Sequence, residues 1–182
     1  MPNYRRASAN NGSTFFFTVN TYRRRSFLVS PECRDALRKG LQTARKNAPF
    51  SIEAWVLLPD HLHCIWTLPD GDGDFSRRWN VIKTTFSSVM KSRLHRTDWA
   101  RSSGIKHRDL TIWQRRFWEH CVRDDNDFRR HVDYIHFNPV KHGVAAQVSD
   151  WPYSTFHRYC SQGVYPQDWA GRAEDDTGEF GE

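Results

Sequence analysis

Two histidines separated by a single residue, His61 and His63, are the sharpest chemical feature of the sequence. On a strand, side chains at positions i and i+2 point to one face, so the two imidazoles project together while Leu62 and Cys64 turn to the other face. Two neighbouring imidazoles supply half of the ligands that a divalent metal ion needs. A surface or packing role for the two rings is the alternative.

A second feature is Tyr134, which lies in a segment predicted to be helical. Tyr134 and Asn138 are four residues apart and share one helix face, with His131 beside them. Val132 and Ile135 belong to a separate, apolar face that lies roughly 90° away. The amide oxygen of Asn138 suits a hard cation, and a tyrosine hydroxyl becomes a nucleophile once its high pKa is overcome. The alternative is that Tyr134 is a half-buried aromatic residue.

Together the two features allow one mechanism. A divalent ion on His61, His63 and Asn138 would polarise a phosphate oxygen while Tyr134 attacks phosphorus. The attack would form a covalent phosphotyrosine and release a 3′-hydroxyl. The combination therefore indicates phosphodiester cleavage by a tyrosine nucleophile.

The elements that must position these residues follow from hydrophobic patterns, caps and turns. The sequence predicts strands at 14–22, 50–58, 61–68 and 112–123, and helices at 31–49, 75–95, 124–139 and 149–160. Pro59 and Asp60 form a turn that joins the second and third strands into a hairpin. In the second helix, Val89 is among the residues expected to face inward. The strand-helix-strand-strand-helix-strand-helix order, followed by a last helix, predicts an α+β protein with a ferredoxin-like split antiparallel sheet.

Composition limits the class of protein. The 182 residues are the size of one domain, and Lys+Arg of 27 against Asp+Glu of 21 give a net charge of +6, which favours a polyanionic partner. An aromatic content of 14% argues against disorder and provides rings for base stacking. No apolar stretch approaches the ~20 residues of a membrane span. We therefore expect no membrane association, a cytoplasmic location and mostly buried, reduced cysteines.

The C-terminal residues differ from the rest of the chain. Residues 171–182 contain five acidic residues and one Arg with little to bury, which predicts a mobile acidic tail. The body of the chain is therefore more basic than the total, and we expect the tail to compete with nucleic acid for that basic surface. The sequence predicts a functional domain over residues 1–160 and a C-terminal extension over residues 161–182.

Several blocks of the sequence, in order, resemble one known family. They are residues 12–20, 58–66, 116–120, 133–143 and 151–156, so the resemblance covers about residues 10–160. The chain resembles the REP-associated tyrosine transposases, the single-tyrosine branch of the HUH nuclease superfamily. Residues 59–63 are typical of the HUH histidine pair, and residues 134–141 of the helix that carries the nucleophile.

The resemblance implies a ferredoxin-like fold, a Mg²⁺ or Mn²⁺ site on His61 and His63, and Tyr134 as the nucleophile. In related single-tyrosine transposases a glutamine one turn after the tyrosine completes the metal site. Here Asn138 holds that position, with a side chain one methylene shorter.

The family's substrates are repetitive extragenic palindromes, which fold as imperfect hairpins flanked by a short tetranucleotide. The resemblance therefore implies a single-stranded DNA endonuclease and strand transferase that acts on such hairpins through a 5′-phosphotyrosine. It also implies a monomer or homodimer in the bacterial cytoplasm, associated with the nucleoid.

Basic and aromatic residues beside the motif blocks are the candidate DNA contacts. We expect salt-dependent phosphate contacts from the cations and base stacking from two tryptophans. The candidates are Arg5, Arg6, Arg23, Arg24, Arg25, Arg77, Arg78, Lys83, Arg115, Arg116 and Lys141, with Trp79 and Trp118. Asp60 and Glu119 are expected to orient the metal-binding imidazoles as hydrogen-bond acceptors, although a turn role for Asp60 is equally natural.

Two other functions stay open on the sequence alone. One is a catalytically silent protein that binds palindromic repeats through the same basic surface. The presence of His61, His63 and Tyr134 together argues against it, because a pure binder has no use for all three. The other is a structural zinc site on the two histidines of an RNA-binding domain, and the scattered cysteines count against it.

Overall fold

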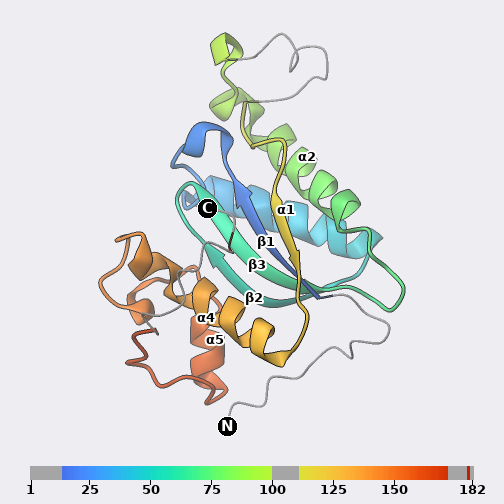
Figure 1. Ribbon diagram of the computed structural model, residues 1–182. Coiled ribbons are helices and arrows are strands. Elements are labelled where there is room, and N and C mark those ends of the chain that lie inside the picture. The colour runs from blue at the N-terminus through green and yellow to red at the C-terminus, as the bar shows by residue number, and fades with distance from the viewer. Residues whose placement is uncertain (1–13, 100–110, 172–179, 181–182) are drawn as a thin grey trace.

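The computed structural model describes residues 14–99, 111–171 and 180. Its elements are β1 (Thr14–Asn20), η1 (Tyr22–Arg24), α1 (Pro31–Asn47), β2 (Ser51–Leu57), β3 (His61–Thr67), α2 (Phe75–Leu94), η2 (Thr97–Trp99), β4 (Trp118–Cys121), α4 (Asp125–Lys141), η3 (Val148–Asp150) and α5 (Phe156–Ser161). The sheet has the order β2-β3-β1-β4, and all neighbouring strands are antiparallel (Figure 1). The predicted ferredoxin-like α+β architecture is confirmed. Within these ranges no helix is long and apolar enough to cross a membrane.

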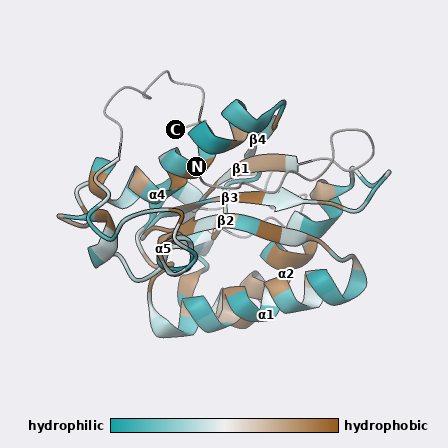
Figure 2. Ribbon diagram, turned by 90° about the horizontal axis from the view of Figure 1, so that it is seen from below, coloured by the Kyte–Doolittle hydropathy of each residue, from teal (hydrophilic) through white to brown (hydrophobic). Residues whose placement is uncertain are grey.

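The two faces of the sheet bury different layers of side chains. Leu62 and Cys64 of β3 belong to the hydrophobic core under α1 and α2, and Ile65 belongs to a second core with Val132 and Ile135 of α4. Figure 2 shows α1 and α2 on one side of the sheet and α4 on the other. The alternation predicted for β3 is therefore confirmed, and it turns His61 and His63 toward the α4 side.

Helix α4 is fixed at both ends by capping interactions. The Asp124 carboxylate accepts hydrogen bonds from the backbone N–H groups of Asn126 and Asp127, both at 2.9 Å. The sequence predicted an end near Pro139, but the helix continues to Lys141. Proline removes only one backbone donor this close to the end, and the turn then closes at Gly143, whose φ of +65° favours glycine.

Three other local predictions are corrected. The last strand of the sheet is only Trp118–Cys121, because residues 112–117 meet β1 through a single bridge between Thr21 and Trp113. Val89 of α2 is 47% exposed instead of facing inward. The predicted helix at 149–160 is divided into η3 and α5 by residues 151–155.

A buried histidine joins α4 to the edge of the sheet. His136 Nε2 donates to Thr155 Oγ1 at 2.9 Å, and that hydroxyl also accepts from the backbone N–H of Trp55 on β2 at 2.9 Å. Burial, followed by the nearby charges of Arg158 and His157, lowers the pKa of His136 to about 3. The imidazole is therefore neutral in the folded protein at neutral pH.

The pKa of His136 predicts how stability depends on pH. Below about pH 6.5 the unfolded chain binds a proton that the folded protein does not bind until about pH 3, so the free energy of unfolding falls as pH drops through this window. The contribution of this histidine is at most ~1.4 kcal/mol per pH unit. We expect His136→Gln, which keeps a hydrogen-bond donor, to show a shallower decline in urea titrations between pH 6.5 and 4. Equal slopes for the two proteins would contradict this assignment.

Candidate metal and nucleophile site

The two histidines of β3 use the same ring atom, Nδ1, in their hydrogen bonds to neighbouring residues. The Nδ1 of His61 lies 2.7 Å from Asp60 Oδ1, and the Nδ1 of His63 lies 2.8 Å from Thr18 Oγ1. Both rings are buried, and their centroids are 4.9 Å apart. Because each Nδ1 donates to an oxygen, Nε2 is the atom of each ring that suits a metal ion. The expected role of Asp60 as an acceptor for His61 therefore matches the geometry.

Asp60 is itself held by Arg24, whose Nε lies 3.0 Å from Asp60 Oδ2. Burial alone would raise the pKa of Asp60, but the hydrogen bond from His61 and the charge of Arg24 hold it below its ordinary value. Arg23 and Arg24 have φ values of +57° and +54°, a left-handed conformation that costs non-glycine residues about 1–3 kcal/mol each. The chain thus accepts backbone strain where it directs Arg24 toward Asp60.

Helix α4 brings a polar stripe against the histidine pair. The Tyr134 ring lies 5.3 Å from the His63 ring, and two turns later the His142 ring lies 4.9 Å from the His61 ring. Asn138 is midway between these contacts on the same face and is fully buried. The structure therefore brings Tyr134, His61 and His63 together, with Asn138 one turn after Tyr134 on the same face of α4. The sequence interpretation missed His142, although its i, i+4, i+8 spacing from Tyr134 and Asn138 was visible.

The donor set fits a divalent cation. Neutral imidazole nitrogens and an amide oxygen are suitable ligands for Mn²⁺ and, through the oxygen, for Mg²⁺. His61 Nε2 and Asn138 Oδ1 are both buried side-chain atoms at this junction of β3 and α4.

Lys141 also reaches the tyrosine. Its Nζ lies 3.4 Å from Tyr134 Oη and 4.9 Å from the centre of the Tyr134 ring. The sequence interpretation assigned Lys141 only to phosphate binding. In the structure its ammonium group also contacts the candidate nucleophile.

The ring of Tyr134 is covered by Phe180. The two rings are nearly parallel, with centroids 3.7 Å apart, and Phe180 is only 2% exposed. The Thr18 hydroxyl donates to the Phe180 carbonyl oxygen at 2.7 Å, so it accepts from His63 Nδ1. The expectation that the tail has little to bury is therefore wrong at Phe180, while residues 172–179 and 181–182 lie outside the described part of the chain.

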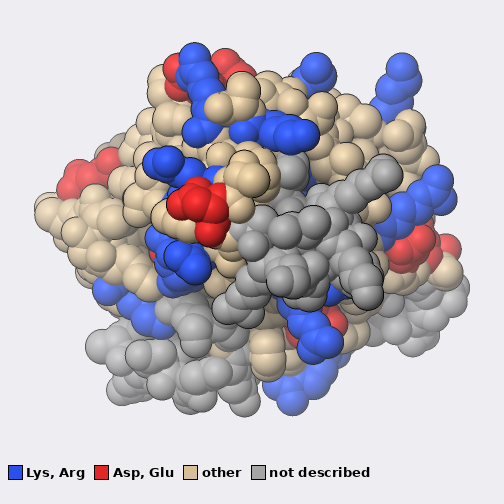
Figure 3. All heavy atoms as spheres, turned by 90° about the horizontal axis from the view of Figure 1, so that it is seen from above, with Lys and Arg blue, Asp and Glu red and all other residues tan. Residues whose placement is uncertain are grey.

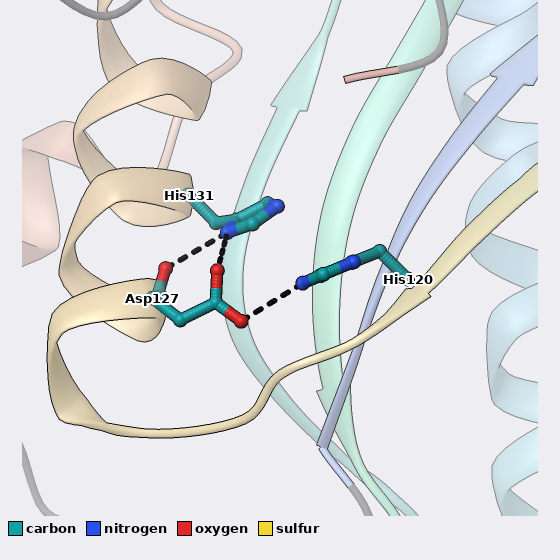
Figure 4. A group of neighbouring side chains, drawn as sticks. All are labelled: His120, Asp127 and His131. Carbon is teal, nitrogen blue, oxygen red and sulfur yellow. Dashed lines mark hydrogen bonds and ion pairs between the residues drawn. The ribbon is translucent and has the colours of Figure 1, made fainter. Parts of the chain in front are cut away.

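A second group of possible metal ligands lies nearby, formed by His120, Asp127 and His131 (Figure 4). Within the described residues, it is the one group of three or more His, Cys, Asp or Glu side chains whose ligand atoms all lie within 4.8 Å of one another. His120 Nε2 lies 2.8 Å and Arg123 Nε lies 3.1 Å from the same Asp127 oxygen. Burial would raise the pKa of Asp127, but these hydrogen bonds and that of the Arg123 backbone hold it well below its usual range. The Arg123 guanidinium already neutralises the carboxylate, which makes this group a poorer cation site than the β3 pair.

Three predicted site residues are corrected by their positions. Arg78 is 2% exposed and binds Asp72 and three backbone carbonyls, and Trp79 is 1% exposed and stacks on Trp66 at 4.3 Å. Neither side chain can contact DNA from the interior. Glu119 pairs with Phe17, so it lies on the α1/α2 face of the sheet, opposite the histidines that it was expected to orient.

The other predicted DNA contacts have mixed environments. Arg23 packs on Trp99, Arg25 donates to the carbonyls of Leu94 and Thr111, and Lys83 donates to the carbonyl of Gln114. Exposed candidates are Arg77, Arg115, Arg116 and Trp118. Arg5 and Arg6 lie outside the described residues. Figure 3 shows cationic side chains at several separate places on one face, with acidic groups among them.

Comparisons with known proteins agree with the geometry. No family model matches the chain. Over 175 residues it is 49% identical to the REP-associated tyrosine transposase of Escherichia coli strain K12, covering 96% of this chain and 94% of that protein. A putative REP-associated tyrosine transposase of Haemophilus influenzae is 39% identical over 174 residues, or 96% of both chains.

A solved structure of a REP-associated tyrosine transposase bound to a REP hairpin is also similar. It superposes with a TM-score of 0.78 and 47% identity, covering 100% of this chain and 98% of that one. The sequence identity and the shared fold extend over nearly the whole of each protein. The chain therefore belongs to the family of REP-associated tyrosine transposases.

Proposed function

We propose that this transposase cuts and rejoins single-stranded DNA at repetitive extragenic palindrome hairpins. Tyr134 is the nucleophile, and His61, His63 and Asn138 hold Mg²⁺ or Mn²⁺. The observation that carries the proposal is the 5.3 Å contact between the rings of Tyr134 and His63. A nucleophile and a metal must both reach one phosphate, and the closeness of these two rings supports such an arrangement. The hairpin substrate is supported by the similar transposase whose structure contains a REP hairpin.

The reaction exchanges one phosphodiester bond for another. Tyr134 Oη attacks phosphorus, the new bond to tyrosine forms, and the bond to the 3′ oxygen breaks. The tyrosine proton passes to solvent, and the departing 3′ oxygen takes a proton from solvent. A divalent ion held by His61, His63 and Asn138 would stabilise the negative charge of the phosphate in the transition state. Rejoining is the reverse, with a 3′-hydroxyl attacking the phosphotyrosine and releasing Tyr134.

The proposal gives Lys141 a part in forming the nucleophile. An ammonium group 3.4 Å from the phenol oxygen stabilises the phenolate, which is the form that attacks phosphorus. The exposed cations Arg77, Arg115 and Arg116 then supply phosphate contacts, and Trp118, at 47% exposure, offers a ring for stacking. We further propose a cytoplasmic, nucleoid-associated protein that acts as a monomer or homodimer.

The second candidate is a silent binder of the same hairpins. The covered ring of Tyr134 is the observation that favours it, because DNA cannot reach the nucleophile while Phe180 is in place. A labelled hairpin with single-stranded flanks separates the two functions. A covalent protein–DNA adduct formed in Mn²⁺ supports the transposase reaction, and tight binding without any adduct supports the silent binder.

Replacing the nucleophile should separate binding from cleavage. We expect Tyr134→Phe to keep its affinity for the hairpin, because the ring and its packing remain, and to form no adduct. Denaturing gels of labelled DNA give the adduct, and gel shifts give the affinity. An adduct on Tyr134→Phe at the wild-type level would show that another residue is the nucleophile.

Metal binding should depend on the β3 histidines. We expect His61→Ala and His63→Ala to weaken Mn²⁺ binding by about tenfold or more, as measured by electron paramagnetic resonance of free Mn²⁺. The matched control is His120→Ala, which alters the neighbouring His/Asp group and should bind Mn²⁺ as the wild type does. If His120→Ala loses Mn²⁺ binding and His61→Ala keeps it, the metal site is the group of His120, Asp127 and His131.

Lys141 should act on rate more than on affinity. We expect Lys141→Met to slow adduct formation at saturating DNA by about tenfold at neutral pH, equivalent to ~1.4 kcal/mol of lost phenolate stabilisation. The deficit should shrink toward pH 10, where phenol ionises unaided, and Lys141→Arg should restore much of the rate. If Lys141→Met binds DNA more weakly but forms the adduct at the normal rate at saturating DNA, Lys141 contacts phosphate and does not stabilise the phenolate.

A further inference from the structure

The space that Phe180 fills has the shape and chemistry of a site for a flat ring. Tyr134 forms one wall, stacked on Phe180 at 3.7 Å with only 8° between the ring planes. Phe16 and His131 meet the Phe180 ring nearly at right angles, at centroid distances of 6.0 and 5.1 Å. The ring is buried to 2% exposure, so the site encloses a whole aromatic ring directly beside the nucleophile.

Two polar groups line this aromatic site. The Thr18 hydroxyl donates to the Phe180 carbonyl oxygen at 2.7 Å. His131 is 2% exposed, and its Nδ1 lies 2.8 Å from the Asp127 carbonyl oxygen, so Nδ1 carries the proton and Nε2 is an acceptor. Nε2 is buried and has no hydrogen-bond partner among the described residues, and it lies at the end of a ring that extends away from α4 (Figure 4). Burial lowers the pKa of His131, which keeps the ring neutral.

These features match what an unpaired nucleobase requires. A base is a flat ring that stacks on aromatic side chains, with carbonyl acceptors and N–H donors on its edge. The Phe180 ring occupies this site as an aromatic base would, and the Thr18 hydroxyl, which donates to the Phe180 backbone carbonyl, becomes available to a base when Phe180 leaves. A donor such as an exocyclic amino group would satisfy His131 Nε2, an atom that Phe180 leaves without a partner.

We infer that the Phe180 site is a binding site for one unpaired base next to the scissile phosphate, and that Thr18 and His131 form hydrogen bonds with the edge of this base. This inference rests on the proposed function, because it assumes that DNA reaches Tyr134. It adds a source of selectivity at the cleavage point that is separate from hairpin recognition. The base and Phe180 then exclude each other from the same site.

The test is a binding cycle, which requires no cleavage. In a Tyr134→Phe background, which keeps the stacking wall, affinities are measured for hairpins whose flanking nucleotides are replaced one at a time by an abasic nucleotide. Phe180→Ala should strengthen binding of the intact hairpin. At one flanking position the abasic substitution should weaken binding by about tenfold and abolish the gain from Phe180→Ala. A gain that is equal for intact and abasic DNA at every position would overturn the inference.

Substitutions of His131 test whether this residue discriminates among the four bases. Four hairpins that differ only in the base at the sensitive position are compared on the wild-type protein, His131→Phe and His131→Gln. We expect His131→Phe, which keeps a ring, to lose the discrimination among bases, and His131→Gln to restore part of it, with thermal unfolding confirming that both variants fold. Unchanged discrimination in folded His131→Phe would overturn the role of His131. Failure of the proposed function appears elsewhere, as wild-type protein that binds these hairpins and forms no adduct.

Discussion

The packing of α4 against β3 is the constraint on which the rest of the site depends. Neither element carries a site alone, since β3 supplies two imidazoles and α4 supplies a phenol and an amide. Their contact is fixed by apolar residues on the same surfaces, with Val132 and Ile135 of α4 in one core with Ile65 of β3. Because this apolar contact is buried, hydrophobic packing also fixes the position of Tyr134 and Asn138 relative to the histidines. The geometry of the candidate site and the stability of the fold are therefore coupled.

The parts of this arrangement that follow from periodicity were predictable. The alternation of β3 placed His61 and His63 on one face, and the four-residue spacing of Tyr134 and Asn138 placed both on one side of α4. The element order was also predictable from hydrophobic patterns, caps and turns, and the structure has N-caps at Ser30, Asp74 and Asp124. The family resemblance supplied the nuclease chemistry and the DNA substrate, which spacing alone did not.

What the sequence did not reveal depends on tertiary contacts. Arg78 looked like a surface cation in a basic helix, but the carbonyls of Ala48, Pro49 and Asp74 and the carboxylate of Asp72 surround it. Glu119 was expected to orient the histidines, but its strand register, which the sequence does not reveal, places it on the opposite face of the sheet. Phe180 is an isolated aromatic residue in an acidic segment, so no pattern indicates that it stacks on Tyr134. Long-range partners decide each of these cases, and no local pattern encodes them.

In the proposed reaction, one phosphate contacts both Tyr134 and the metal ion that the β3 histidines hold. The most direct measurement is anomalous diffraction from crystals of Tyr134→Phe with a hairpin substrate and Mn²⁺. The account predicts a manganese peak bound by His61, His63 and Asn138, with a phosphate oxygen among its ligands and the ring at position 134 beside that phosphate. A peak at His120, Asp127 and His131, or a phosphate distant from α4, would contradict it.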